Sequence, residues 1–255
     1  MDGFIKIASL IFLYTNPVHT FFLVTIALTP GIAIAIYIYI HDKHEPEPIQ
    51  LLLLSFFYGA LSLGINLAIA IPVDSLIHIN EKNLTNQAIH AFGVVAFLEE
   101  FSKFIFVRGI LYKNKNFNEP LDGIVYSVMV GMGFATAENI IYVLQGGGGT
   151  AIVRMFSAIP AHALFAVLMG YWLGKAKFTH EREFYYGAVA LFVATFFHGI
   201  YDYFLFISFV PGIWVWSFVS LIIAFVLARK AVRVHQQASP FISVKENEEI
   251  VIKPD

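Results

Sequence analysis

The chain has 255 residues, of which 58% are hydrophobic and 13% charged, and its mean hydropathy is +0.72. A soluble domain of this length carries roughly 25% charged residues, so the composition argues against an ordinary soluble enzyme. The net charge of −2 offers no basic surface for nucleic acid, and the absence of cysteine excludes disulfides and thiolate chemistry. The charges fall between apolar runs of about 20 residues, the length that crosses about 30 Å of hydrocarbon as a helix. We therefore predict an all-α, polytopic transmembrane helix bundle.

Seven apolar runs follow one another along the chain as predicted spans. They cover residues 18–40, 49–71, 88–111, 121–145, 151–174, 184–207 and 213–228. An earlier apolar run, residues 4–14, is too short to cross alone and is followed by Asn16-Pro17, so it is expected at the interface or as a half-helix. If it also crosses, the bundle has eight spans. We divide the chain into an N-terminal interfacial or half-helix segment, residues 1–17, a transmembrane domain, residues 18–228, and a cytoplasmic polar tail, residues 229–255.

Glycine and proline punctuate this pattern. Residues 146–149 are four consecutive glycines and are expected to form a flexible turn, whereas Pro211-Gly212 turns the chain before the last span. Six further glycines are expected where helices pack closely, because a missing side chain lets two backbones approach. They are Gly59, Gly64, Gly131, Gly133, Gly170 and Gly174.

Lysine and arginine in short loops predict the orientation, because they are enriched on the cytoplasmic side. One alternate set of loops holds ten, namely Lys43, Arg108, Lys113, Lys115, Lys175, Lys177, Arg182, Arg229, Lys230 and Arg233, and the opposite set holds two, Lys6 and Lys82. The first set is therefore assigned to the cytoplasm. The C-terminus is then cytoplasmic and the N-terminus outside, unless residues 4–14 also cross.

Ionisable groups lie inside four consecutive predicted spans. They are Glu99, Glu100 and Lys103; then Glu138; then His162; and finally His198 with Asp202. Such groups cost a few kcal/mol each in hydrocarbon, so they usually face the bundle interior and are functional. Measured from the outer end of each span, Glu99, Glu138, His162 and His198 lie at depths of about 10 to 18 Å. The sequence thus predicts one layer of ionisable groups, slightly nearer the outer face.

The spacing within two of these spans indicates how the groups pair. Lys103 follows Glu99 by four residues and Glu100 by three, so it can reach either carboxylate. The two carboxylates point about 100° apart on a helix, so we expect one to face the chemistry and the other a supporting helix. His198 and Asp202 share one helix face, which suits a carboxylate that orients an imidazole or two ligands of one metal.

The layer carries more negative than positive charge. Glu99, Glu100, Glu138 and Asp202 face a single cation, Lys103. Protonated carboxylates, a divalent metal or charged histidines would each restore the balance. Histidine and carboxylate ligands suit zinc, which lowers the pKa of bound water to about 7. A carboxylate and a histidine could instead activate water without a metal.

Two polar neighbours of the layer receive structural roles. Asn139 is expected to form a hydrogen bond between helices, and Arg154 to mark the outer end of the fifth span.

Three motifs occur in order along these spans. Residues 99–103 read E-E-x-x-K, residues 134–139 read F-x-x-x-E-N and residues 198–202 read H-x-x-x-D, with His162 between the last two. The order resembles the PrsW family of intramembrane proteases, related to the CAAX-protease and bacteriocin-processing superfamily, over residues 18–228. In that wider superfamily the second motif ends in His and the third in Asn. Here Glu138 and Asp202 take these places, as in the PrsW pattern, which makes the site more acidic.

The resemblance implies hydrolysis of a peptide bond in a membrane-anchored protein near the extracytoplasmic side of the cell membrane. Site-1 cleavage of an anti-sigma factor is the family's activity. The expected partners are then a single-span membrane protein substrate, such as an anti-sigma factor, and the lipid bilayer, with no nucleic acid.

A mechanism follows as a hypothesis. Glu99 activates water as general base, while Glu100 and Lys103 hold the helix and tune the pKa of the Glu99 carboxyl group. His162 and His198 either ligate zinc, with Glu138 as the third ligand, or stabilise the oxyanion directly. Asp202 orients His198.

Two other functions remain open from the residues alone. The same carboxylates suit a proton- or cation-coupled membrane transporter. Inverted repeats and paired broken helices would favour that class, and the sequence shows neither. A non-catalytic membrane scaffold is the third interpretation.

Overall fold

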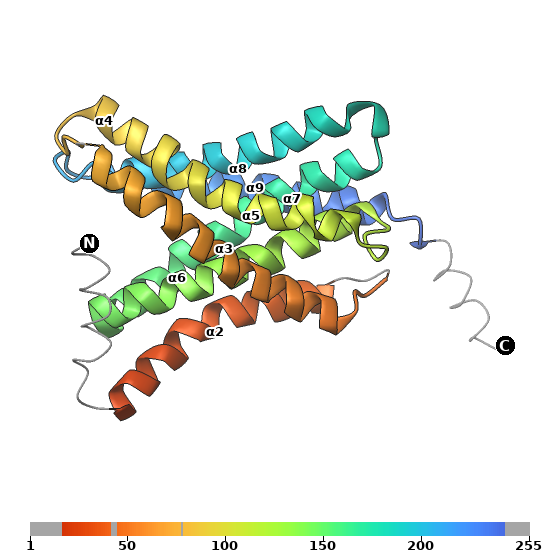
Figure 1. Ribbon diagram of the computed structural model, residues 1–255, viewed down its shortest axis with the longest axis horizontal. Coiled ribbons are helices and arrows are strands. Elements are labelled where there is room, and N and C mark those ends of the chain that lie inside the picture. The colour runs from red at the N-terminus through yellow and green to blue at the C-terminus, as the bar shows by residue number, and fades with distance from the viewer. Residues whose placement is uncertain (1–16, 42–44, 78, 243–255) are drawn as a thin grey trace.

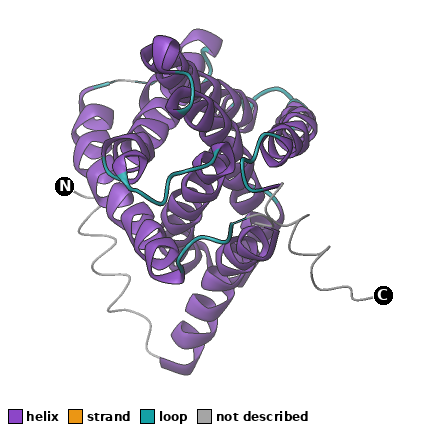
Figure 2. Ribbon diagram, turned by 90° about the vertical axis from the view of Figure 1, so that its right-hand side faces the viewer, coloured by secondary structure: helices purple, strands orange, loops and turns teal. Residues whose placement is uncertain are grey.

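The computed structural model describes residues 17–41, 45–77 and 79–242, and every regular element in these ranges is a helix (Figure 2). The long helices are α2 (Pro17–His41), α3 (Ile49–Leu76), α5 (Phe97–Gly109), α6 (Pro120–Phe156), α7 (Ala158–Lys177), α8 (Glu183–Phe206) and α9 (Val215–Gln237). Short helical segments are α4 (Leu84–Ala88), η1 (Ile89–Ala96), η2 (Leu111–Lys113) and η3 (His180–Arg182). The all-α prediction is confirmed.

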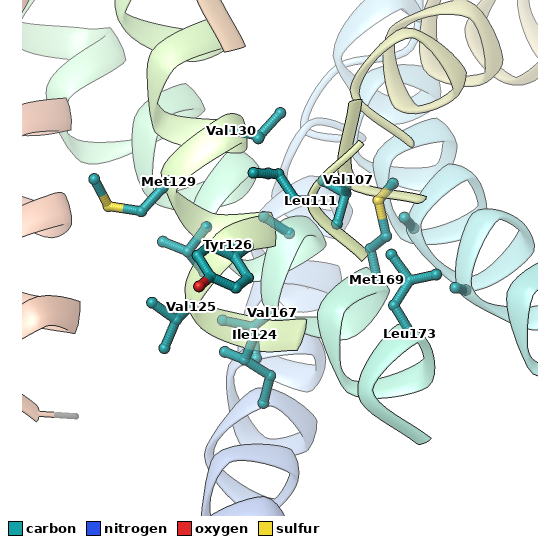
Figure 3. Close-up of a cluster of buried hydrophobic side chains, with 14 of the residues drawn as sticks. Val107, Leu111, Ile124, Val125, Tyr126, Met129, Val130, Val167, Met169 and Leu173 are labelled. Atoms are coloured by element: carbon teal, nitrogen blue, oxygen red, sulfur yellow. The ribbon is translucent and has the colours of Figure 1, made fainter. Parts of the chain in front are cut away.

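Helix α6 is the central element of the bundle. It packs extensively against α2 and α3 on one side and α7 on the other, and α7 in turn contacts α8 and α9 (Figure 1). Tyr126 of α6 lies at the middle of the main hydrophobic cluster, together with Val107 from α5 and Leu173 from α7 (Figure 3). This core fixes the relative positions of the helices that carry the ionisable residues.

Glycines allow the helices around α6 to approach closely. A Cβ atom on Gly133 would collide with the carbonyl oxygen of Phe56, and one on Gly59 would collide with that of Val130. Gly123 meets Gly170 and Gly174 of α7 in the same way. Close packing is therefore confirmed for five of the six predicted glycines, since a Cβ atom added to Gly131 would lie only 2.8 Å from the Ala166 Cβ atom. It is wrong for Gly64, beside which the structure has open space.

Five segments of the described chain are long and apolar enough to cross a membrane. They are Val18–His41, Ile49–Leu76, Pro120–Lys177, His180–Phe206 and Val215–Gln237, and the third comprises both α6 and α7. Many large apolar side chains point outward, including Phe21, Phe184 and Trp216, which are 74%, 89% and 55% exposed. Such continuous apolar surface is typical of contact with lipid. The chain is a membrane protein with several candidate spans, and the count of seven stays a prediction.

The third predicted span is built differently from the others. Residues 88–111 fall on the end of α4, on the π-helical segment η1 and on α5, which follow one another with helical dihedral angles at both junctions. In a π-helix each backbone N–H group bonds to the carbonyl group five residues earlier. Such helices are rare, and many of those known lie at functional sites. Here it ends at Ala96, three residues before Glu99.

Four predicted boundaries are wrong. The second span was expected to end at residue 71, but α3 continues through Pro72 to Leu76. The expected flexible turn at residues 146–149 is a kink within α6, where Gly147 adopts φ 73° and ψ −166° and the helix resumes to Phe156. Helix α7 consequently begins at Ala158 and not at residue 151. Helix α9 continues past residue 228 to Gln237, so the start of the predicted polar tail is helical, because Ala228, Ala231 and His235 remain buried on one face. Residues 4–14 lie outside the described part of the chain.

Candidate active site

Helix α5 carries the two adjacent carboxylates and the lysine. Glu99, Glu100 and Lys103 are 6%, 0% and 3% exposed. The Lys103 Nζ atom donates to Glu100 Oε1 at 2.6 Å and lies 3.8 Å from Glu99 Oε2. Lys103 therefore pairs mainly with Glu100. The Glu99 Oε2 atom has no hydrogen-bond partner among the described residues.

Helix α8 contributes His198 and Asp202 to the same site. The His198 Nδ1 atom lies 2.8 Å from Glu100 Oε1, and its Nε2 atom lies 3.1 Å from Asp202 Oδ2 and 3.9 Å from Glu99 Oε2. The imidazole stacks on Phe165 with ring centroids 4.9 Å apart, so its plane is held on both edges and one face. Glu100 thus contacts a supporting helix, whereas Glu99 is the freer of the two carboxylates.

Helices α6 and α7 complete the layer with Glu138 and His162. The His162 Nε2 atom lies 3.2 Å from Glu138 Oε2, and its Nδ1 atom lies 3.3 Å from Lys103 Nζ. Because an ammonium only donates, Nδ1 accepts from Lys103 and the Nε2–H group donates to Glu138. The rings of His162 and His198 are 5.1 Å apart, so four helices meet at one point.

Arg154 belongs to this site, although the sequence was interpreted as placing it at the outer end of a span. Its Nη2 atom donates to Glu138 Oε2 at 2.6 Å, its Nε atom donates to Asn139 Oδ1 at 2.9 Å, and its guanidinium lies over the Tyr142 ring. Asn139 in turn donates to the Ala27 carbonyl of α2 at 3.0 Å, which is the interhelical hydrogen bond that was predicted. The kink at Gly147 turns the end of α6 so that Arg154 reaches back.

These contacts resolve most of the predicted charge imbalance. Lys103 and Arg154 balance two of the four carboxylates, Glu100 and Glu138. Both ring nitrogens of His198 face carboxylate oxygens, and the ring can donate from both only as an imidazolium. In that form its positive charge balances a third carboxylate. One negative charge then remains, and the carboxylate without a hydrogen-bonded cation is Glu99.

A divalent metal ion fits this arrangement if it replaces Lys103 as the partner of the His162 Nδ1 lone pair. One oxygen of Glu99 and one ring nitrogen each of His162 and His198 lie within 4.8 Å of one another, and all three residues are buried. Glu138 accepts from one imidazole and Glu100 from the other, as carboxylates commonly do behind metal-bound histidines. A neutral His198 together with a doubly charged ion would leave the layer without net charge. The sequence-based hypothesis had Glu138, His162 and His198 as ligands, whereas the group of neighbouring ligand atoms found here consists of Glu99, His162 and His198.

An open groove reaches two of the site carboxylates. It has a volume of about 330 Å³ and is lined by residues of α3, η1, α5 and α6, with Glu99 and Glu138 among them. Neither Glu100 nor the two histidines line it. A substrate in the groove would therefore meet Glu99 and Glu138 first.

A bundle of apolar helices that buries carboxylates, histidines and a potential metal centre beside an open groove defines an intramembrane hydrolase. The family model described as "PrsW family intramembrane metalloprotease" matches residues 47–228. The chain belongs to this family and is an intramembrane protease.

Curated relatives support the same assignment. The chain is 36% identical to Protease PrsW of Geobacillus kaustophilus over 185 residues, which cover 72% of this chain and 80% of that relative. It is 34% identical to Protease PrsW of Bacillus subtilis over 188 residues, covering 72% and 83%. It is 30% identical to Protease PrsW of Halalkalibacterium halodurans over 184 residues, covering 71% and 82%. No solved structure matches the chain.

Proposed function

We propose that this protein is a zinc-dependent endopeptidase that cleaves a membrane-anchored protein near the extracytoplasmic side, and that Glu99, His162 and His198 hold the ion. The observation that carries the proposal is the mutual proximity of these three ligand atoms, all within 4.8 Å, at a point where Glu99 also lines an open groove. Histidine and carboxylate are the usual ligands of catalytic zinc.

Each residue of the layer receives a role in hydrolysis. The ion, when bound, polarises the scissile carbonyl and lowers the pKa of water. Glu138 lines the groove beside Glu99, takes the proton that the attacking water releases and delivers it to the leaving amine nitrogen. Arg154 holds Glu138 Oε2 in place, and the Lys103–Glu100 pair holds His198 through its Nδ1 atom. With Nδ1 held in this way, His198 would bind the ion through Nε2, and the Asp202 Oδ2 atom lies 3.1 Å from that nitrogen.

This assignment exchanges two roles of the sequence-based hypothesis, in which Glu99 was the base and Glu138 a ligand. The reason is geometric. The Glu138 Oε2 atom already accepts from Arg154 and lies 3.2 Å from His162, whereas the Glu99 Oε2 atom has no hydrogen-bond partner among the described residues. A ligand atom needs a free lone pair directed at the ion, and Glu99 provides it.

The substrate that we propose is a single-span membrane protein, such as an anti-sigma factor, that receives its first cut outside the cytoplasm. Seven spans with the C-terminus in the cytoplasm would place Ile79, Glu81 and Gln87, which line a pocket adjoining the groove, on the extracytoplasmic side. The distribution of loop lysines and arginines supports that orientation.

Reconstitution with a single-span reporter protein tests the proposal. Elemental analysis of the purified wild-type protein should find about one zinc per chain, as the single proposed site requires. Glu99→Gln should lose both zinc and cleavage, and Glu138→Gln should keep zinc while cleavage falls about 100-fold or more, the loss typical for a general base. Full cleavage by Glu99→Gln, or undiminished cleavage by a protein shown to be free of metal, would reject the assignment.

A further inference from the structure

The groove beside the site has an uneven chemical character. Most of its lining is apolar and comes from three elements: Leu63, Leu67, Ala70 and Ile71 of α3, Val94 and Val95 of η1, and Ile141 of α6. On α3, the polar residue Asn66 lies among these apolar neighbours. The groove thus has apolar stretches in all three walls, with the amide of Asn66 in the α3 wall, Tyr142 and Gln145 in the α6 wall, and Glu99 and Glu138 among its lining residues.

Asn66 is unusual because its amide oxygen is buried without a partner. The side chain is 6% exposed, and no hydrogen bond to its Oδ1 atom comes from any described residue. Buried polar atoms in folded proteins nearly always have a hydrogen-bond partner, so an orphaned acceptor in the wall of a groove indicates a donor that arrives with a ligand.

The groove continues outward along the chain's own surface. A second pocket, lined by residues of the segment 77–87, shares Asp74 and His90 with the first. The His90 Nε2 atom lies 3.2 Å from Asp74 Oδ1 at this junction, while α3 and η1 otherwise make few contacts. A chain entering beside Ile79, Glu81 and Gln87 can therefore follow one path to Glu99.

We propose that this groove binds an unwound segment of the substrate, and that the Asn66 Oδ1 atom accepts a hydrogen bond from a substrate backbone N–H group. The inference rests on the proposed function, because it places a peptide at the site. A substrate helix would already satisfy its own backbone N–H groups, whereas an extended segment presents them to the groove wall. Asn66 is then a positioning residue for the scissile bond, and the apolar walls accept the substrate's side chains.

Kinetics of an Asn66→Leu variant test the role of the amide. Leucine has nearly the shape of asparagine but cannot accept a hydrogen bond, so kcat/KM for the reporter should fall about tenfold while zinc content and thermal stability stay at the wild-type level. Asn66→Asp, which keeps an acceptor, should retain more activity than Asn66→Leu. Ser127→Ala is the matched control, because Ser127 also has a buried oxygen without a described partner but does not line the groove. Unchanged kcat/KM in Asn66→Leu would overturn the role of Asn66.

Photo-crosslinking tests the path independently of Asn66. A benzophenone amino acid is placed at Ile71, in the groove wall, or at Phe192, which is 67% exposed on α8 and lies outside the groove. In a Glu138→Gln background that spares the reporter, the probe at position 71 should capture it and the probe at position 192 should not. Capture at 192 but not at 71 would overturn the groove even if wild-type protein cleaves the reporter. Absence of cleavage by wild-type protein would instead count against the proposed function.

Discussion

Arg154 follows Glu138 by 16 residues, yet its guanidinium donates to Glu138 Oε2 and to the neighbouring Asn139. Both side chains of the ion pair are largely buried, at 14% and 12% exposure. A carboxylate in such a place needs a fixed cation, because its own desolvation is costly. Arg154 therefore performs at Glu138 what Lys103 performs at Glu100, and in each case a histidine contacts the same carboxylate oxygen as the cation.

Removing the charge of Arg154 should destabilise the site. In Arg154→Gln the buried Glu138 loses its cation, so the free energy of unfolding should fall by about 3 kcal/mol, the loss typical of a broken buried pair. Cleavage should fall as well, because Glu138 is no longer held. Denaturant titration in micelles and reporter cleavage measure the two effects. Arg154→Lys is the control and should recover most of the stability but less of the activity, since lysine cannot contact Glu138 and Asn139 together. Wild-type behaviour of Arg154→Gln would contradict this role.

Tyr126 provides a residue-scale test that leaves the active site alone. Its hydroxyl donates to a carboxylate oxygen of Glu47, and both residues are almost fully buried, at 0% and 3% exposure. Tyr126→Phe removes this donor and should cost about 1 to 3 kcal/mol of unfolding free energy. Cleavage at permissive temperature should persist, because neither residue touches the catalytic layer. Tyr185→Phe, at a tyrosine that is 60% exposed, is the control and should change stability little.

At the scale of elements, hydrophobicity alone located nearly every helix. Predicted residues 18–40 and 184–207 agree with α2 and α8 to within about a residue, because both are bounded by polar or proline-containing segments. Boundaries failed where tertiary contacts override local signals. The four glycines at residues 146–149 predict a turn because they lack side chains. In the structure α6 only kinks at Gly147 and then resumes, and the resumed segment carries Arg154, which donates to Glu138.

The kink at Gly147 should depend on glycine. Its φ of 73° and ψ of −166° fall in a region that side chains exclude, so Gly147→Ala should cost about 1 to 3 kcal/mol and displace Arg154. Cleavage should fall together with stability. Gly148→Ala is a close control, because Gly148 has open space around it and no positive φ, so alanine should be neutral or stabilising there. Equal stability of the two variants, measured by thermal unfolding, would show that the kink does not need glycine.

At the scale of the whole molecule, span depth placed Glu99, Glu138, His162 and His198 in one layer, and the structure brings all four together. Depth is readable from sequence because helix rise and membrane thickness are fixed. Rotation about each helix axis is not, so the sequence did not indicate that an oxygen of Glu99 lies close to a ring nitrogen of both histidines. The Arg154–Glu138 contact and the groove could not be predicted for the same reason, since both depend on how the helices lie against one another.

Orientation supplies the last prediction, and the chain is well suited to it because it contains no cysteine. Lys82 and Lys115 are both exposed and lie on either side of the helical path from α4 to α5. If loops rich in lysine and arginine face the cytoplasm, a cysteine at position 82 should react with a membrane-impermeant maleimide in intact cells. A cysteine at position 115 should react only after the membrane is permeabilised.

The same pair of variants tests whether the α4-to-α5 path crosses the membrane. Labelling of both cysteines from one side would mean that this path does not span, and labelling of Lys115→Cys alone in intact cells would reverse the proposed orientation. The cysteine-free parent is the control and should remain unlabelled throughout. Because Glu99 lies between the two positions, accessibility from opposite sides would place the catalytic layer within the membrane, where an unwound substrate segment must reach it.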